Sequence, residues 1–224
     1  MLVPMTDEVD QDGIPIVAVP ARASVGRRKA IIEAAREEFL KVGYAAASMD
    51  AITARSKVSK PTLYSHFGNK ERLFLAVIGG ALRDAYAELG TPPCEMSRSP
   101  DLRAALSGYL GRWARALLDE DLLRLRRLVI GEIGRFPELG RLWFQITDDQ
   151  LNRPLEDELA KLHVKGRLHV PDAPLAARQL IAMAIGAPQL VRTMLPERAF
   201  DERELTPVVT SAVEVFLSHY GPSS

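Results

Sequence analysis

The stretch from Met49 to Phe67, with the sequence MDAITARSKVSKPTLYSHF, restricts the possible folds of this chain more than any other segment. Its apolar residues recur at helical spacing and predict two short helices joined by a tight turn. Neither helix is long enough to be stable alone, so the pair must pack against neighbouring helices. A pair of this size is the form of a DNA-binding helix-turn-helix, although two surface helices of an ordinary bundle have the same spacing.

Residues that start and stop helices flank both members of this pair. Ser48 and Ser59 suit N-cap positions, where a hydroxyl accepts a hydrogen bond from an exposed backbone N–H. Pro61 fits the first turn of the second helix, because a backbone N–H has no helical partner there. Gly68 can end that helix in a left-handed conformation, and Asn69 can cap the next one. These residues therefore predict the limits of both helices.

One face of the second helix has the chemistry of a DNA-reading surface. At about 100° per residue, Leu63 and Phe67 turn toward the protein interior. The opposite face is rich in hydroxyl groups, with a phenol and an imidazole expected at its edges. Thr, Ser and His side chains can contact base edges, and a phenol or lysine ammonium can contact phosphates. The residues that we expect to bind DNA are Ser48, Lys57, Ser59, Lys60, Pro61, Thr62, Tyr64, Ser65, His66 and Lys70.

The distribution of charge favours a nucleic-acid partner for this segment. The whole chain has no formal net charge, which argues against a protein that coats nucleic acid non-specifically. Residues 1–20 hold four acidic and no basic side chains, whereas residues 21–75 hold eleven basic and five acidic ones. Positive charge is thus concentrated around the predicted helix pair, as expected for a DNA-binding surface.

Composition indicates a packed globular protein. Hydrophobic residues make up 47% of the chain, yet no segment approaches the ~20 uninterrupted apolar residues of a membrane span. The N-terminus lacks the basic start and apolar run of a signal peptide. The single cysteine, Cys94, excludes an internal disulfide and fits a reducing compartment. We therefore expect a cytoplasmic protein.

Helical periodicity extends along the rest of the chain. Apolar stripes predict helices over residues 27–42 and 69–89, and residues 100–219 have an all-helical pattern. Breaks or bends are expected at Phe136-Pro137, Pro154, residues 166–174, Gly186 and Pro188. We predict an all-α fold with a three-helix head that contains the helix-turn-helix, followed by a helical bundle. The predicted regions are a disordered tail (1–24), a DNA-binding domain (25–70) and a ligand-binding and dimerisation domain (71–224).

Residues 27–78 resemble the DNA-binding head of the tetracycline-repressor (TetR) family of bacterial transcriptional regulators. The residues that carry the resemblance are Ile31, Ala34, Phe39, Gly43, Tyr44, Ser48, Met49, Ile52, Ala54, Val58, Ser59, Leu63, Tyr64, Phe67, Lys70, Leu73 and Phe74. Lys57 departs from the family pattern, in which a small residue more often precedes the valine of the turn. Residues 126–144 and 166–180 resemble one C-terminal subgroup of the family.

The resemblance implies a homodimer that binds a double-stranded DNA operator and responds to a small-molecule effector. It also implies that the last two long helices pair with those of a second subunit. Small residues such as Ala182, Ala184 and Gly186 would permit a close approach of these helices. The alternative is that both helices bury this face inside one chain.

Candidates for an effector pocket are large side chains of the C-terminal region. They are Trp113, Leu117, Phe136, Trp143, Phe144, Met183 and Met194. Aromatic and methionine residues at helical spacing more often form core, which is the competing interpretation for each of them. Arg124, Arg126 and Arg127 could hold an acidic ligand, but a solvated face has the same pattern.

The motifs of common enzymes are missing from the sequence. It contains no phosphate-binding glycine loop, nucleophile elbow or His-Glu metal motif, so we expect no enzyme, cofactor or metal site. We predict a ligand-responsive transcriptional regulator, a repressor that a small molecule releases from a palindromic operator. Activation in place of repression is an alternative, because the position of the operator decides whether binding raises or lowers transcription. Two further alternatives are a helical carrier that has lost DNA binding and a redox sensor that acts through Cys94.

Overall fold

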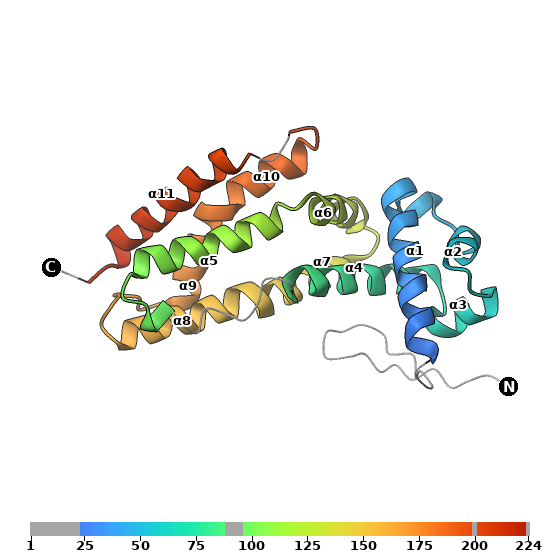
Figure 1. Cartoon of the computed structure of the whole chain (residues 1–224), viewed down its shortest axis with the longest axis horizontal. Helices are drawn as coiled ribbons and strands as arrows, with labels where there is room; N and C mark the ends of the chain where they lie inside the picture. Colours follow the sequence, from blue (N-terminus) through green and yellow to red (C-terminus); the bar gives the residue numbers. More distant parts are fainter. Residues whose placement is uncertain (1–22, 88–95, 199–200, 223–224) are drawn as a thin grey trace. The chain divides into compact units, whose positions relative to one another are not determined.

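The computed structural model describes residues 23–87, 96–198 and 201–222, and helices account for nearly all of them (Figure 1). No β-strand occurs within these ranges, which confirms the predicted all-α fold. Residues 1–22 of the predicted tail, and Cys94 with its suggested redox role, lie outside the described residues. The α-helices are α1 (Ala23–Ala46), α2 (Met49–Ser56), α3 (Lys60–Phe67), α4 (Lys70–Ala87), α5 (Leu102–Leu117), α6 (Glu120–Glu132), α7 (Pro137–Thr147), α8 (Arg153–Val164), α9 (Ala173–Ile181), α10 (Ala187–Met194) and α11 (Glu202–Tyr220). Three short turns complete the order, the 3₁₀ turn η1 (Met96–Arg98) and the π-helical turns η2 (Asp148–Asn152) and η3 (Ala182–Gly186).

These helices form two compact units. Unit 1 contains the described residues up to Arg83 together with Arg124–Ile146. Unit 2 contains Asp84–Leu123 and the described residues from Thr147 onward. The chain passes between the units within α4, within α6 and at the end of α7. Each unit is therefore built from segments that are far apart in the sequence.

In unit 1, α1, α2 and α3 form the three-helix head that the sequence predicts. Its core contains Phe39, Ile52 and Leu63, each at most 1% exposed. The backbone of α1 leaves helical geometry at Gly43, where φ is +76° and ψ is 173°. Glycine adopts this conformation readily because it has no Cβ. The predicted end of the first regular helix at this glycine is therefore confirmed, and one more turn leads to Ser48.

The turn between α6 and α7 packs against the head within unit 1. The ring of Phe136 lies 4.7 Å from the ring of Tyr44 and 6.5 Å from that of Phe74, measured between centroids. The guanidinium of Arg135 lies over the rings of Tyr44 and Phe136, at 5.3 Å and 5.1 Å from their centroids, respectively. Phe136-Pro137 thus provides the predicted break between two helices, and it also supplies an aromatic anchor for the head.

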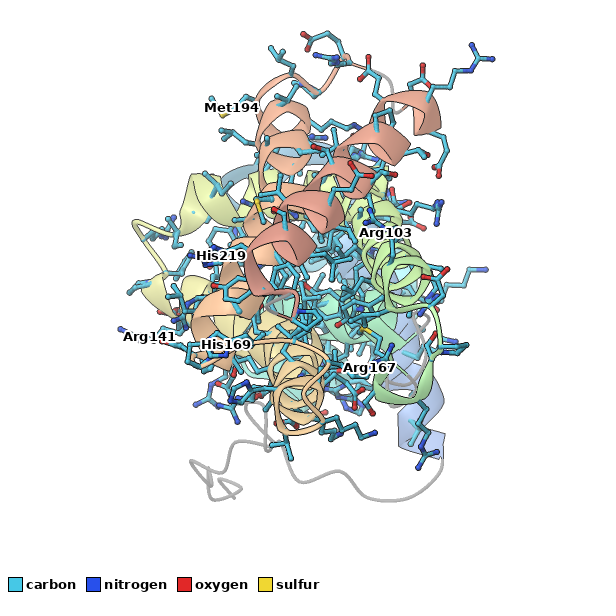
Figure 2. The ribbon with its side chains drawn as sticks, turned by 90° about the vertical axis from the view of Figure 1, so that its left-hand side faces the viewer. Arg103, Arg141, Arg167, His169, Met194 and His219 are labelled. Carbon is cyan, nitrogen blue, oxygen red and sulfur yellow. The ribbon has the colours of Figure 1, made fainter. Side chains whose placement is uncertain are left out.

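In unit 2, α5 and α11 lie side by side (Figure 1). Leu110 on α5 and Phe216 on α11 are buried, and the carboxylate of Glu214 on α11 accepts a hydrogen bond of 3.1 Å from Arg103 on α5. Figure 2 shows Arg103 on α5 and His219 near the end of α11. The buried residues of α11, which are Leu205, Val209, Ala212, Val213, Phe216 and Tyr220, recur at helical spacing and form its core-facing side.

Two of the predicted bends are π-helical turns. Pro154 follows η2, and Pro188 follows η3, each in the first turn of the next helix. A π-helical turn frees backbone groups from their usual helical partners. In η2 the carbonyl oxygen of Leu151 accepts a hydrogen bond of 3.3 Å from the hydroxyl of Tyr109. The bend in this helix is thus linked to α5 within unit 2.

A buried carboxylate fixes η1 to α8 in the same unit. Glu158 is 1% exposed, and its side chain accepts a hydrogen bond from the backbone N–H of Ser97 at 3.2 Å. The ammonium of Lys161 donates to the other carboxylate oxygen at 2.7 Å. Because both oxygens have donors, the cost of burying this charge is offset.

Candidate nucleic-acid interface

The caps of α2 and α3 are the ones that the sequence predicts. The hydroxyl of Ser48 accepts a hydrogen bond of 3.1 Å from the N–H of Ala51, and that of Ser59 accepts one of 3.3 Å from the N–H of Thr62. Gly68 ends α3 with φ +71°. Its N–H donates to the carbonyl of Tyr64 at 2.8 Å. Local hydrogen bonds therefore satisfy backbone groups that a short helix would otherwise leave exposed.

Lys57 ends α2 in the left-handed conformation, with φ 56° and ψ 25°. A side chain with a Cβ is disfavoured in this region, which is most easily occupied by glycine. This backbone geometry explains why a small residue is more usual at this position. The lysine supplies an exposed positive charge in the turn at the expense of some backbone strain.

The outward face of α3 presents hydroxyl groups, as predicted. Pro61 and Ser65 are exposed, Thr62 is partly exposed, and the side chain of Tyr64 is 42% exposed. The hydroxyl of Thr62 lies 2.8 Å from that of Ser59, and the hydroxyl of Ser65 donates to the carbonyl oxygen of Thr62 at 2.8 Å. These contacts hold the hydroxyl groups in place at the start of the helix. The face is ordered by short-range hydrogen bonds before any ligand contacts it.

The predicted position of His66 at the edge of this face is wrong. His66 is only 9% exposed, and its ring lies 6.1 Å from that of Phe67. On the helical wheel it is only about 60° from Leu63, so it shares the inward half of the helix. Burial, followed by the charges of Arg28 and Arg27, lowers the pKa of His66. The imidazole is thus part of the head's packing.

Two of the predicted phosphate-binding lysines have partners within the head. The ammonium of Lys60 lies 2.6 Å from the carboxylate of Asp50, which raises the lysine pKa through the hydrogen bond and through its charge. The ammonium of Lys70 donates to the carbonyl oxygens of Ala47 at 2.8 Å and Ala45 at 3.2 Å. Burial lowers the pKa of Lys70.

Lys70 also lies over the ring of Tyr44, 4.5 Å from its centroid. With its two carbonyl contacts, this lysine holds the end of α1 against the start of α4. The sequence interpretation of Lys70 as a residue directed at phosphate omitted this role, because the contacts join residues more than twenty positions apart.

Sequence reasoning also missed three residues that position the helix pair. Arg28 of α1 lies over the ring of Phe67, 5.3 Å from its centroid. Arg55 of α2 donates to Glu37 of α1 at 2.7 Å. Asp50 is the third, through its ion pair with Lys60. The concentration of charge near the helix pair was visible in the sequence, but the pairing of these groups depends on tertiary structure.

Models of two protein families match the chain. The model described as bacterial regulatory proteins of the tetR family matches residues 31–77, which include α2 and α3. The model described as the AefR-like transcriptional repressor, C-terminal domain, matches residues 104–222, just over half of the chain. The chain belongs to the TetR family of bacterial transcriptional regulators.

Solved structures agree with this assignment to the TetR family. A structure described as a TetR-family transcriptional regulator from Mesorhizobium loti is 30% identical, with a TM-score of 0.82 over 90% of this chain and all of that one. The flavonoid-responsive regulator FrrA is 27% identical, with a TM-score of 0.75 over 88% of this chain and 98% of that one.

Curated relatives match the chain over shorter segments. The transcriptional activator FasR of Mycolicibacterium smegmatis is 52% identical over 52 residues, 23% of this chain and 24% of that protein. The repressor SCO4008 of Streptomyces coelicolor is 33% identical over 73 residues, 33% of this chain and 38% of that protein. The chain thus matches less than two fifths of the length of each of these relatives. The family match identifies a DNA-binding regulator that is not an enzyme, and it leaves the direction of regulation open.

The predicted effector residues of this TetR-family protein belong to both units. Phe136, Trp143 and Phe144 belong to unit 1, whereas the other predicted residues belong to unit 2. Phe136 is buried against Tyr44 and Phe74, so its assignment to an effector pocket is corrected to a packing role. Phe144 is 69% exposed, and its assignment to an effector pocket stays a prediction.

In unit 2, Trp113 has an environment that is compatible with the predicted pocket. It is buried, with ring centroids 5.3 Å from Tyr86 and 6.2 Å from Tyr109. Leu117 is buried on the same helix, and Met183 is partly exposed in η3. Met194, at 70% exposure, projects away from α10 in Figure 2 and does not belong to this group.

A cavity of about 120 Å³ lies elsewhere in unit 2, between the end of α5, α10 and the start of α11. It is lined by Leu118, Pro188, Val191, Arg192, Arg198, Asp201, Glu204, Leu205 and Val208. None of the predicted effector residues lines it. Its wall includes Arg192, which donates to the carbonyl of Leu118 at 2.7 Å and to Glu120 at 3.0 Å.

Two further findings concern the described residues only. Among them, no group of three or more His, Cys, Asp or Glu side chains could hold a metal ion. No helix in the same ranges has the length and apolar character needed to cross a membrane.

Proposed function

We propose that this protein is a homodimeric repressor that binds a near-palindromic operator and is released from it by a small organic effector. In this proposal, residues 25–70 form the DNA-binding domain, and residues 71–224 serve effector binding and dimerisation. The site of action is the cytoplasm, where the chromosome is accessible.

The exposed hydroxyl face of α3 is the observation that carries the DNA-binding part of the proposal. A recognition helix enters the major groove with its N-terminal residues facing base edges. Thr62 and Ser65 occupy this face and have the chemistry to contact bases. In this proposal Tyr64, Lys57 and the helix cap at Ser48 contact phosphates. Ser59, Lys60 and Pro61 complete the start of the helix.

Exposed apolar residues on the last helices support a dimer. Leu190 is 61% exposed, Met194 is 70% exposed, and Val215 on α11 is 52% exposed. Large exposed apolar side chains on adjacent helices mark protein interfaces. Regulators of the TetR family act as dimers, and two recognition helices would read half-sites about one DNA turn, or a small multiple of it, apart.

Repression is favoured by the part of the chain that the relatives match. The family model that covers residues 104–222 is described as a repressor, and SCO4008 is also described as one. The activator FasR matches over 52 residues only, too few to include most of residues 104–222. We therefore infer repression.

An aromatic effector is favoured by the side chains of unit 2. The rings of Tyr86, Tyr109 and Trp113 lie close together, and the hydroxyl of Tyr86 lies 2.9 Å from that of Thr147. Such a group can stack on a planar ring and hydrogen-bond to its substituents. FrrA, which is similar over 98% of its own length, is described as flavonoid-responsive. We infer a planar, hydroxylated aromatic compound as the effector.

The DNA-binding part is tested by selecting genomic fragments that the purified protein retains. The selected fragments are expected to share a near-palindromic motif. Thr62→Ala combined with Ser65→Ala should change the preferred bases, while Ser211→Ala, an exposed hydroxyl on α11, should leave them unchanged. An identical motif for the double variant would contradict base reading by α3.

The effector part is tested by titrating flavone and its hydroxylated derivatives into the protein–operator complex. Release of DNA at concentrations that also quench Trp113 fluorescence is expected. Trp143 would contribute a background signal, so Trp143→Phe serves as the parent protein. Quenching without release would contradict the proposed role of this compound class.

A further inference from the structure

The ion pair between Asp50 and Lys60 lies where the first turn of α2 meets the first turn of α3. The distance between the ammonium of Lys60 and the carboxylate of Asp50 is 2.6 Å, and their side chains remain 55% and 74% exposed, respectively. Lys60 is the first residue of α3, and Asp50 lies in the first turn of α2. Both are within the surface that the proposed function assigns to DNA.

A carboxylate at this place is unfavourable for a DNA-binding surface. In a helix-turn-helix the recognition helix enters the groove, while the first helix of the motif crosses the phosphate backbone. The N-terminus of a helix attracts anions, including phosphates, through its exposed N–H groups and its dipole. Asp50 places a negative charge of the protein's own at this end of α2, close to the expected path of the DNA strand.

Lys60 is also engaged by this carboxylate in the protein without DNA. A lysine ammonium contributes to affinity by displacing a counterion from a phosphate. Lys60 must weaken its contact with Asp50 to do so, and because both groups are exposed the exchange is feasible at modest cost. Arg55 and Lys70 differ from Lys60, since Arg55 points back to α1 and Lys70 to the end of α1.

We propose that Asp50 is an affinity-setting residue, which holds Lys60 in the unbound protein and releases it to a DNA phosphate on binding. This inference rests on the proposed function, because it requires α3 to dock on DNA. Asp50 acts here through another side chain and is a positioning residue. It lowers affinity for operator and unrelated DNA alike, since a phosphate contact carries no sequence information.

The test compares Asp50→Asn with Glu33→Gln in the full-length protein. Glu33 is exposed on α1 and lies 3.8 Å from Lys29, so its substitution makes the same charge change and also frees a lysine. Asp50→Asn is expected to tighten binding about fivefold at low salt, the upper range for an exposed ion pair. Glu33→Gln should change affinity by less than about twofold, because exposed charges farther from the DNA are screened. The probes are the selected operator duplex and an unrelated duplex of equal length.

Lys60→Gln provides the second arm of the experiment. It should reduce the steepness of log affinity against log salt by about 0.9, the value for one phosphate contact. In the Lys60→Gln background the gain from Asp50→Asn should fall below about twofold. An undiminished gain in that background, or an equal gain from Glu33→Gln, would overturn the proposal. An unchanged salt slope for Lys60→Gln would overturn it as well.

The outcomes separate this inference from the proposed function. Wild-type protein that binds no duplex at any salt concentration contradicts both. Wild-type protein that binds its operator, with Asp50→Asn and Glu33→Gln indistinguishable from each other, contradicts only the role of Asp50. Thermal unfolding of each variant distinguishes an affinity change from a folding defect.

Discussion

In unit 1 the caps that begin α2 and α3 come from their neighbours in the sequence, whereas in unit 2 several contacts that hold the helices come from partners far away in the chain. Ser48 and Ser59 cap residues three positions ahead of them. In unit 2, Glu158 holds η1, and Arg192 binds the carbonyl that ends α5. The difference teaches that the hydroxyl face of α3 is shaped mainly by local hydrogen bonds, although Arg28 and Arg55 position the helix pair through tertiary contacts. The bundle of unit 2 adds long-range contacts to local caps such as those of Asp101 and Asp172. Substitutions in the two regions should therefore affect stability and DNA binding in different ways.

The largest effect is expected from Leu63→Asp on α3. Leu63 is fully buried, so the variant places an unpaired carboxylate in the core of the head and should lower the free energy of unfolding by about 4 kcal/mol. Urea denaturation measures the change. Tyr64→Asp, one position along on the exposed side, serves as control and should cost less than about 1 kcal/mol. Equal losses would show that the two faces of α3 are not distinct.

Phe136→Ala comes next, because it removes the aromatic anchor of the α6–α7 turn. Loss of its packing on Tyr44 and Phe74 should lower the free energy of unfolding by about 3 kcal/mol. Phe144→Ala makes the same chemical change at an exposed site and should change it by less than about 0.5 kcal/mol. If Phe136→Ala instead left stability intact and abolished the effector response, its original assignment to a pocket would be restored.

Glu158→Ala tests the long-range contacts of unit 2. The backbone N–H of Ser97 would lose its partner, which should lower the free energy of unfolding by about 2 kcal/mol. Glu158→Gln keeps an acceptor oxygen and should cost less. Hydrogen exchange should place the loss in η1 and α8, and protection lost first in α2 and α3 would contradict the separation of the two regions.

Lys57→Gly tests the local backbone geometry of the turn between α2 and α3. The left-handed backbone at this position should become more favourable by about 1 kcal/mol, partly offset by the greater freedom of the unfolded chain. Affinity for DNA should fall at the same time, because one positive charge is lost. A variant that is both less stable and weaker in binding would argue against strain at this residue.

The smallest effect is expected from the titration of His66. Its pKa is lowered from 6.5 in the folded protein, so below that pH the unfolded chain binds the proton more readily. The contribution to stability is complete above pH 6.5 and is lost as the pH falls through the pKa of the folded state. His66→Gln should flatten this part of the stability profile, measured by urea denaturation between pH 7.5 and about 5. If the stability of His66→Gln depended on pH in the same way as that of the wild-type protein, the pH dependence would belong to other groups.

The sequence predicted most of what neighbours in the chain determine. The caps of α2 and α3, the positive φ of Gly68 and the inward position of Leu63 all follow from residue type and helical spacing. The sequence also predicted bends near Pro154 and Pro188, because proline disrupts the helical ladder at a known position. It did not predict that these bends are π-helical turns, since that geometry depends on contacts such as the one between Tyr109 and Leu151.

The errors concern residues whose roles depend on distant partners. His66 was placed at the edge of the exposed face although its angle from Leu63 is small. Lys70 was assigned to phosphate, but its contacts at the end of α1 come from the packing of α4 against α1. Phe136 is an aromatic residue of the kind that often lines a ligand pocket, but in the structure it packs against Tyr44. In each case residue type was informative, and the decisive partner lay on another helix.

The passage of the chain between the two units within α4, within α6 and at the end of α7 has a practical consequence for fragments. A protein truncated after α4 would keep the recognition helix but lose Arg135 and Phe136, which cover Tyr44 and Phe74. Such a fragment would expose aromatic rings to water and tend to aggregate. A soluble, minimal DNA-binding fragment would need residues 124–146 fused through a linker to the segment that ends with α4.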